Sequence, residues 1–219
     1  MNRTVKIIVD GRPCAVREGE PLLPVLQAEG FNIPALCHHS RLDPLRRCSL
    51  CIIEVHSQGQ WTPNHACTVL GASGLEIRTV SPGIHRLRAL AAQMMLARGP
   101  FRDQSVAVML NEVLTAAEAA GVPWQAGRDT GHGDGLSGDP AASAMAKGCI
   151  LCGRCIAICR KIGRNYLTFL NKGKKLQISY APGAASRGCG ACKACAKLCP
   201  TAFIRTNGQT TFTAKLYRE

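Results

Sequence analysis

The chain contains Cys149-Ile-Leu-Cys152-Gly-Arg-Cys155-Ile-Ala-Ile-Cys159, and forty residues later it contains Cys189-Gly-Ala-Cys192-Lys-Ala-Cys195-Ala-Lys-Leu-Cys199-Pro200. Both stretches have the spacing C-x2-C-x2-C-x3-C, so they form an internal repeat. In this pattern three cysteines bind one cubane iron–sulfur cluster, and the fourth, on the following helix, binds the neighbouring cluster. The repeat therefore predicts a small module built around two [4Fe–4S] clusters.

The same rule predicts which cysteines share a cluster. The first predicted ligand set is Cys149, Cys152, Cys155 and Cys199, and the second is Cys189, Cys192, Cys195 and Cys159. Pro200 after Cys199 matches the usual ending, whereas Arg160 after Cys159 does not. Two zinc sites are the alternative, but they do not explain a third cysteine at the same spacing followed by a fourth.

The N-terminal region predicts a different scaffold. Residues 4–17 alternate like a β-hairpin around Asp10-Gly11, residues 20–30 have the prolines and final glycine of a short helix, and residues 52–55 and 75–77 favour further strands. This order predicts a β-grasp module. Four cysteines follow the helix with the spacing C-x10-C-x2-C-x15-C: Cys37, Cys48, Cys51 and Cys67. The set is a variant of the plant-type [2Fe–2S] plan, with a four-cysteine zinc site as the alternative.

The middle of the chain predicts a connector. Residues 81–98 have helical periodicity, with Ile84, Leu87, Leu90, Ala91 and Met94 along one face, and residues 104–120 form a second helical run. Residues 125–147 are rich in Gly, Ala, Asp and Ser and resemble a linker. We therefore expect an α+β protein with a β-grasp domain at 1–80, a helical connector and linker at 81–147, and a two-cluster bacterial-ferredoxin-like domain at 148–219.

Composition restricts the class of protein. The chain has 13 cysteines in 219 residues and a formal net charge of +13. No signal-peptide core or membrane span is recognisable, so we expect a cytoplasmic protein whose thiols are ligands and not disulfides. Thiolate-bound clusters are anionic and offset much of the positive charge, and without a helix-turn-helix or an aromatic-basic pattern we expect no nucleic-acid partner.

Several further residues carry no predicted chemistry. Cys14 lies in the second strand of the hairpin and is expected in the core. His38 and His39 follow Cys37, where they can tune a cluster but are not expected to ligate iron. No catalytic residue is predicted.

Two regions of the sequence resemble a known family. The first comprises Gly30-Phe-Asn-Ile-Pro-Ala-Leu-Cys37-His-His, Cys48-Ser-Leu-Cys51-Ile-Ile-Glu-Val and His65-Ala-Cys67-Thr-Val, and the second runs from Cys149 to Pro200. Together they are similar to the N-terminal region of the large peripheral iron–sulfur subunit of respiratory complex I. They are equally similar to the diaphorase iron–sulfur subunit of NAD-reducing hydrogenases and to N-terminal regions of [FeFe]-hydrogenases and NAD-dependent formate dehydrogenases.

The resemblance implies a non-catalytic electron-transfer subunit of a soluble NAD(P)-linked complex. Its implied partners are a flavoprotein subunit that exchanges electrons with the nicotinamide and a terminal catalytic subunit. The alternative is an independent ferredoxin-like carrier with transient partners. One departure stands out: residues 97–105 lack the family's motif of one histidine and three cysteines, so we expect that extra [4Fe–4S] cluster to be absent.

Overall fold

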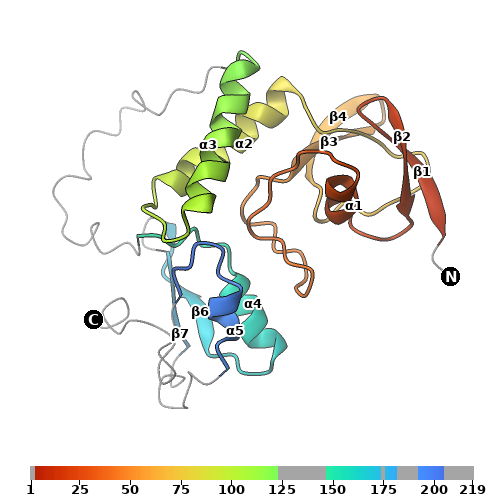
Figure 1. Ribbon diagram of the computed structural model, residues 1–219. Helices are drawn as coiled ribbons and strands as arrows, with labels where there is room; N and C mark the ends of the chain where they lie inside the picture. Colours follow the sequence, from red (N-terminus) through yellow and green to blue (C-terminus); the bar gives the residue numbers. More distant parts are fainter. Residues whose placement is uncertain (1–2, 123–146, 174–175, 182–191, 205–219) are drawn as a thin grey trace. The chain divides into compact units, whose positions relative to one another are not determined.

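The computed structural model describes residues 3–122, 147–173, 176–181 and 192–204 (Figure 1). The chain divides into two compact units, each made of separated stretches. The first combines the described residues of Met1–His38, Cys48–Met94 and Met109–Trp124, and the second combines those of His39–Arg47, Met95–Val108 and Gln125–Glu219. The predicted linker at 125–147 lies almost entirely outside the described residues.

The first unit begins with the predicted hairpin. Strands β1 (Thr4–Val9) and β2 (Arg12–Arg17) pair antiparallel, with Val9 opposite Arg12. Asp10 and Gly11 both have positive φ, 48° and 77°, which is the geometry of a type I′ turn and matches the twist of the strands. Alternate side chains of β1 are buried, so one face of the hairpin forms part of a core.

Three more strands complete a mixed sheet of order β2-β1-β5-β3-β4. Strand β5 (Glu76–Arg78) runs parallel to β1 and antiparallel to β3 (Ile52–Ser57). Helix α1 (Leu22–Ala28) shares one hydrophobic core with the sheet, into which it buries three leucines. A helix packed on a mixed sheet that begins with a hairpin is the predicted β-grasp arrangement.

Strand β4 (Gln60–His65) was not predicted from the sequence. It contains Pro63, which cannot donate a ladder hydrogen bond and argues against a central strand. The structure places β4 at the edge of the sheet, where proline is tolerated. Its pairing with β3 forms a hairpin closed by Gln58-Gly59, both with positive φ.

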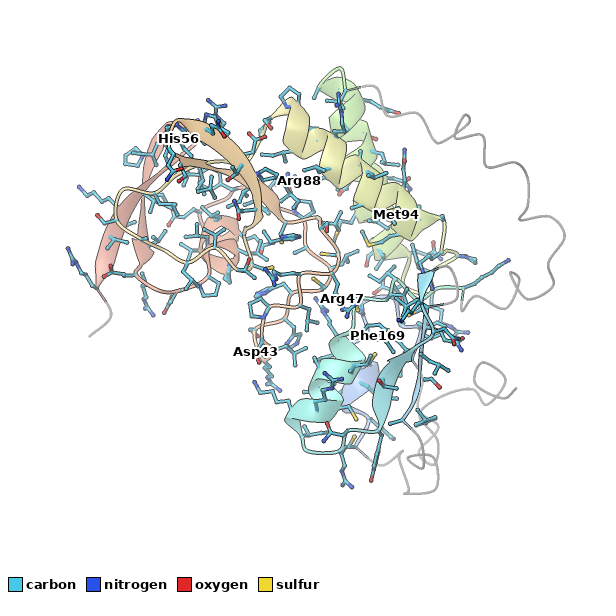
Figure 2. The ribbon with its side chains drawn as sticks, turned by 180° about the vertical axis from the view of Figure 1, so that it is seen from behind. Asp43, Arg47, His56, Arg88, Met94 and Phe169 are labelled. Carbon is cyan, nitrogen blue, oxygen red and sulfur yellow. The ribbon has the colours of Figure 1, made fainter. Side chains whose placement is uncertain are left out.

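The predicted connector helices are present, but most of the apolar face predicted for the first is exposed. Helices α2 (Pro82–Leu96) and α3 (Gln104–Ala119) follow the sheet. On α2, Leu87, Leu90 and Met94 are exposed, and Met94 retains 67% of its accessible surface (Figure 2). The buried side chains of this helix are Ile84, Arg88, Ala89, Ala92 and Met95. Periodicity identified the helix, but a buried arginine and two alanines did not mark its inner face.

The second unit contains short elements around a separate core. Helix α4 (Arg154–Lys161) packs against β6 (Leu167–Leu170) and against α5 (Ala194–Lys197). Strand β6 pairs antiparallel with β7 (Gln177–Tyr180). The buried cysteines of this core, among the described residues, are Cys149, Cys155, Cys159 and Cys195. Cys159 lies on α4 as expected, whereas Cys199 lies just beyond the end of α5. Within the described residues, no helix is long and apolar enough to cross a bilayer.

Candidate iron–sulfur sites

The first pair of N-terminal cysteines meets across the loop that follows α1. The thiols of Cys37 and Cys48 are hydrogen-bonded to each other and are 1% and 5% exposed. This contact, supported by backbone hydrogen bonds at Leu36, Leu50 and Cys37, lowers the pKa of Cys48 despite its burial. The pocket therefore favours a thiolate at Cys48, which is the form that binds metal.

The second pair consists of Cys51 and Cys67, and the β3–β4 hairpin brings it together. Ile52 lies opposite His65, and the Ala66 N–H donates to the Cys51 carbonyl at 2.9 Å, so Cys51 and Cys67 lie at the same end of this hairpin. A hydrogen bond to Cys67, together with burial, raises the pKa of Cys51. The hairpin register thus explains the predicted x15 gap.

The two pairs belong to one site. The charge of Cys48 also acts on Cys51, and all four thiols are buried in the first unit. Four thiols in two pairs match a binuclear cluster in which each iron takes two cysteine ligands. The structure therefore brings together the whole predicted N-terminal set.

The predicted first [4Fe–4S] set also converges, although Cys199 follows Cys155 by 44 residues in the sequence. Burial raises the pKa of Cys149 to about 11 and that of Cys152 to about 12, and the charge of Cys199 adds to both shifts. Burial raises the pKa of Cys155 as well, with further contributions from Cys152, Cys149, Cys199 and Cys195. Thiols whose negative charges raise one another's pKa lie close together. They are suited to bind shared iron ions, whose positive charge offsets that of the thiolates.

The predicted second set is described only in part, because Cys189 lies outside the described residues. Cys159 and Cys195 are buried in the same core, and Cys192 is exposed. The backbone N–H of Tyr166 donates a hydrogen bond to Cys159 Sγ at 3.2 Å. Such N–H···S bonds stabilise a thiolate and are among the features that tune cluster potentials.

Residues 97–105 form hydrogen bonds to the chain segments that carry ligands of the predicted first [4Fe–4S] cluster. The cysteine spacing alone did not predict these contacts. Arg98 Nε donates to the Cys149 carbonyl at 2.5 Å, and the Gly148 N–H donates to the Arg98 carbonyl at 2.5 Å. At the other end, the Asp103 N–H donates to the Thr201 carbonyl at 3.4 Å, two residues after Cys199. The segment that lacks the family's histidine and cysteines thus holds the two chain segments that carry Cys149 and Cys199.

Two residues without predicted chemistry take part in other interactions. Cys14 is buried in the N-terminal core, where burial and the charge of Glu29 raise its pKa. His39 Nδ1 accepts a hydrogen bond from the Arg41 N–H at 3.1 Å. In the described residues, no three His, Cys, Asp or Glu side chains are arranged around a single metal ion. The sites therefore rest on paired and mutually interacting thiols.

The mixed sheet and its four converging thiols define an iron–sulfur protein with a ferredoxin-like N-terminal domain. Residues 2–82 match the family model described as "2Fe-2S iron-sulfur cluster binding domain". This match confirms the expected [2Fe–2S] ferredoxin-like domain.

Comparison with curated proteins confirms the resemblance seen in the sequence. The chain is 25% identical over 205 residues to an NADH-quinone oxidoreductase subunit of Rhizobium meliloti (strain 1021), covering 91% of this chain and 24% of that protein. It is 26% identical over 212 residues to NADP-reducing hydrogenase subunit HndD of Solidesulfovibrio fructosivorans, covering 90% of this chain and 35% of that protein. The chain thus spans about a quarter to a third of the length of these relatives.

A solved structure is similar to this chain in fold. It is a crystal structure of an NAD+-reducing [NiFe]-hydrogenase in the H2-reduced state, with a TM-score of 0.64 and 20% identity. The match covers 96% of this chain and 88% of the other.

Proposed function

We propose that this chain is the electron-transfer iron–sulfur subunit of a soluble, multisubunit NAD(P)-linked oxidoreductase. The convergence of the two thiol pairs, Cys37 with Cys48 and Cys51 with Cys67, carries the proposal. We assign one [2Fe–2S] cluster to these four residues, and we retain the domain ranges 1–80, 81–147 and 148–219. A [2Fe–2S] cluster accepts and releases single electrons.

Two [4Fe–4S] clusters complete the proposed electron path. The first uses Cys149, Cys152, Cys155 and Cys199, and the second uses Cys189, Cys192, Cys195 and Cys159. Mutual electrostatic effects among the first four thiols support the crossed assignment of Cys199. For the second set, the support is the shared core of Cys159 and Cys195 together with the repeat spacing.

The proposed partners are a flavoprotein subunit that exchanges electrons with NAD(P) and a terminal catalytic subunit. Support comes from the relatives, which are named as subunits of NADH-quinone oxidoreductase and of NADP-reducing hydrogenase. In this assignment each cluster is fully bound by four cysteines, so no cluster offers an open coordination site to a substrate. We therefore propose a non-catalytic role for the chain, with the chemistry on its partners, and a cytoplasmic location.

Metal content tests the cluster assignment. Protein purified anaerobically is expected to contain about ten irons per chain, from one binuclear and two tetranuclear clusters. Electron paramagnetic resonance of the reduced protein should show both cluster types. Stoichiometric zinc with little iron would refute the assignment.

Co-purification tests the role in a complex. A tagged chain expressed from its native host is expected to retain a flavin-containing subunit through gel filtration. Cys48→Ser in that complex should remove the [2Fe–2S] signal and NAD(P)-linked turnover, whereas Cys14→Ser should preserve both. A chain that carries all its clusters yet elutes alone would instead favour the independent carrier.

A further inference from the structure

Arg88 is a buried cation at the back of the N-terminal thiol site. It lies on α2, is 6% exposed, and is shown in Figure 2 on the side of the helix that faces the sheet. Its Nη2 donates a hydrogen bond of 2.7 Å to the carbonyl of Ile52. Ile52 follows Cys51 directly, so the guanidinium is anchored to the backbone beside a proposed cluster ligand.

Among the described residues, no carboxylate forms an ion pair with this charge. The ion pairs in this part of the chain are Arg17–Glu20 and His56–Glu76, and neither includes Arg88. The nearby Asp10 attracts it, but both carboxylate oxygens of Asp10 already accept hydrogen bonds, from the N–H and the hydroxyl of Thr79 at 2.7 and 2.5 Å. The buried Nε of Arg88 has no hydrogen-bond partner among the residues that the structure describes.

A buried charge without an ion-pair partner is costly, so its persistence calls for a compensating anion. Burial lowers the pKa of Arg88 to about 10, and the negative charges of Cys51 and Asp10 act against that shift. A group with this pKa remains protonated at neutral pH. The guanidinium therefore keeps its charge, and its bond to the Ile52 carbonyl holds it one residue from Cys51, where a bound cluster would supply the compensating negative charge.

We propose that Arg88 is the counter-charge of the [2Fe–2S] cluster and raises its reduction potential. This inference rests on the proposed assignment of the cluster to Cys37, Cys48, Cys51 and Cys67. A binuclear cluster with four thiolates carries a charge of about −2 when oxidised and gains one more negative charge on reduction. A fixed positive charge stabilises the more negative reduced state more strongly, so it favours uptake of the electron.

Arg88 is thus a positioning and tuning residue and not a ligand. Its hydrogen bond to Ile52 fixes the guanidinium beside the cluster, and its charge biases the redox equilibrium. His85 lies within electrostatic range on the same helix, where burial and then the Arg88 charge lower the pKa of that histidine. The Arg88 charge therefore also acts on a neighbouring side chain of α2.

The test is a redox titration of the full chain with dithionite, monitored by the [2Fe–2S] resonance signal. Arg88→Gln should lower the reduced-to-oxidised ratio at a fixed potential about tenfold, which equals 59 mV for one electron. Arg88→Met removes the same charge and serves as the second variant. Arg88→Lys should stay closer to the wild type, and Arg86→Gln, an exposed arginine two residues away on α2, should not shift the ratio.

The outcomes separate this inference from the proposed function. An unshifted potential in Arg88→Gln or Arg88→Met, or an equal shift in Arg88→Lys, would overturn the role of the charge. If Arg88→Lys still incorporates the [2Fe–2S] cluster but Arg88→Gln and Arg88→Met do not, this result would support the role of the charge. A wild-type protein without any [2Fe–2S] signal would instead refute the cluster assignment itself.

Discussion

The guanidinium carbon of Arg47 lies 4.0 Å from the centre of the Phe169 ring, over its face (Figure 2). Arg47 immediately precedes Cys48, and Phe169 lies on β6 in the second unit, to which residues 39–47 also belong. Gly153 leaves room for this contact, since a Cβ there would lie 3.3 Å from Arg47 Cδ and Nε.

Other residues of the segment between Cys37 and Cys48 are also packed. Lys161 Nζ donates to the Arg41 carbonyl at 2.6 Å, and Leu42 is buried in the core of the second unit. The x10 gap between Cys37 and Cys48 is therefore a packed segment.

Replacing Arg47 by Ala should loosen the second unit. A cation–π contact at a partly exposed site contributes about 0.5–1 kcal/mol, so we expect roughly threefold faster release of [4Fe–4S] iron to a chelator. Absorbance of the iron–chelator complex measures this rate. Arg46→Ala is the matched control from the neighbouring exposed position. Equal rates in both variants would show that the contact does not stabilise the unit.

Replacing Cys159 by Ala should damage the cluster assigned to Cys189, Cys192 and Cys195, because the fourth cysteine of each motif serves the other cluster. The variant should keep the [2Fe–2S] signal and the cluster of Cys149, Cys152 and Cys155. Mössbauer and paramagnetic resonance spectra distinguish these sites. Cys14→Ala, which removes a buried core thiol, should keep about ten irons. Loss of the first cluster alone in the Cys159 variant would contradict the crossed assignment.

Replacing Arg98 by Gln should destabilise the first [4Fe–4S] site. The bond from Arg98 Nε to the Cys149 carbonyl is charge-assisted, and such bonds contribute about 1.5–3 kcal/mol. We expect on the order of tenfold faster loss of that cluster, followed by its resonance signal during exposure to a chelator. Arg102→Gln changes an exposed arginine in the same segment and should have no effect. If Arg98→Gln lost the first cluster no faster than the wild type, the proposed stabilising role of residues 97–105 would be contradicted.

Replacing Gly71 by Ala should destabilise the N-terminal domain. A Cβ at this position would collide with the Arg17 carbonyl, and the backbone on both sides is fixed by hydrogen bonds of 2.9 Å with Gly19 and Glu20. Overpacking of this kind costs about 1–3 kcal/mol, which lowers the thermal midpoint of a domain of this size by at least about 4 °C. Circular dichroism of the [2Fe–2S] absorption band follows the transition. Ser73→Ala, at an exposed position nearby, should leave the midpoint unchanged.

Local patterns predicted most of the elements. The β1–β2 hairpin, helix α1 and both connector helices all follow from periodicity and turn residues in short stretches of sequence. Strand β4 was not predicted, because Pro63 weakens its strand pattern and because position at the edge of a sheet depends on the whole sheet. The buried face of α2 was not predicted either. Leu87, Leu90 and Met94 are the more apolar residues, yet they are exposed, whereas an arginine and two alanines are buried.

By itself, the sequence determined the number and spacing of the thiols, and hence the kind of cluster each set suits. Ligand spacing within a short loop is a local property, so Cys149, Cys152 and Cys155 could be grouped without coordinates. Tertiary structure decided how distant thiols reach these groups: the β3–β4 register delivers Cys67 to Cys51, and packing in the second unit delivers Cys199 to Cys149. It also decided the electrostatic environment, because the hydrogen bond from Arg88 on α2 to the Ile52 carbonyl places this buried charge next to Cys51. Burial and distance set the strength of a charge, and neither can be read from the spacing of residues along the chain.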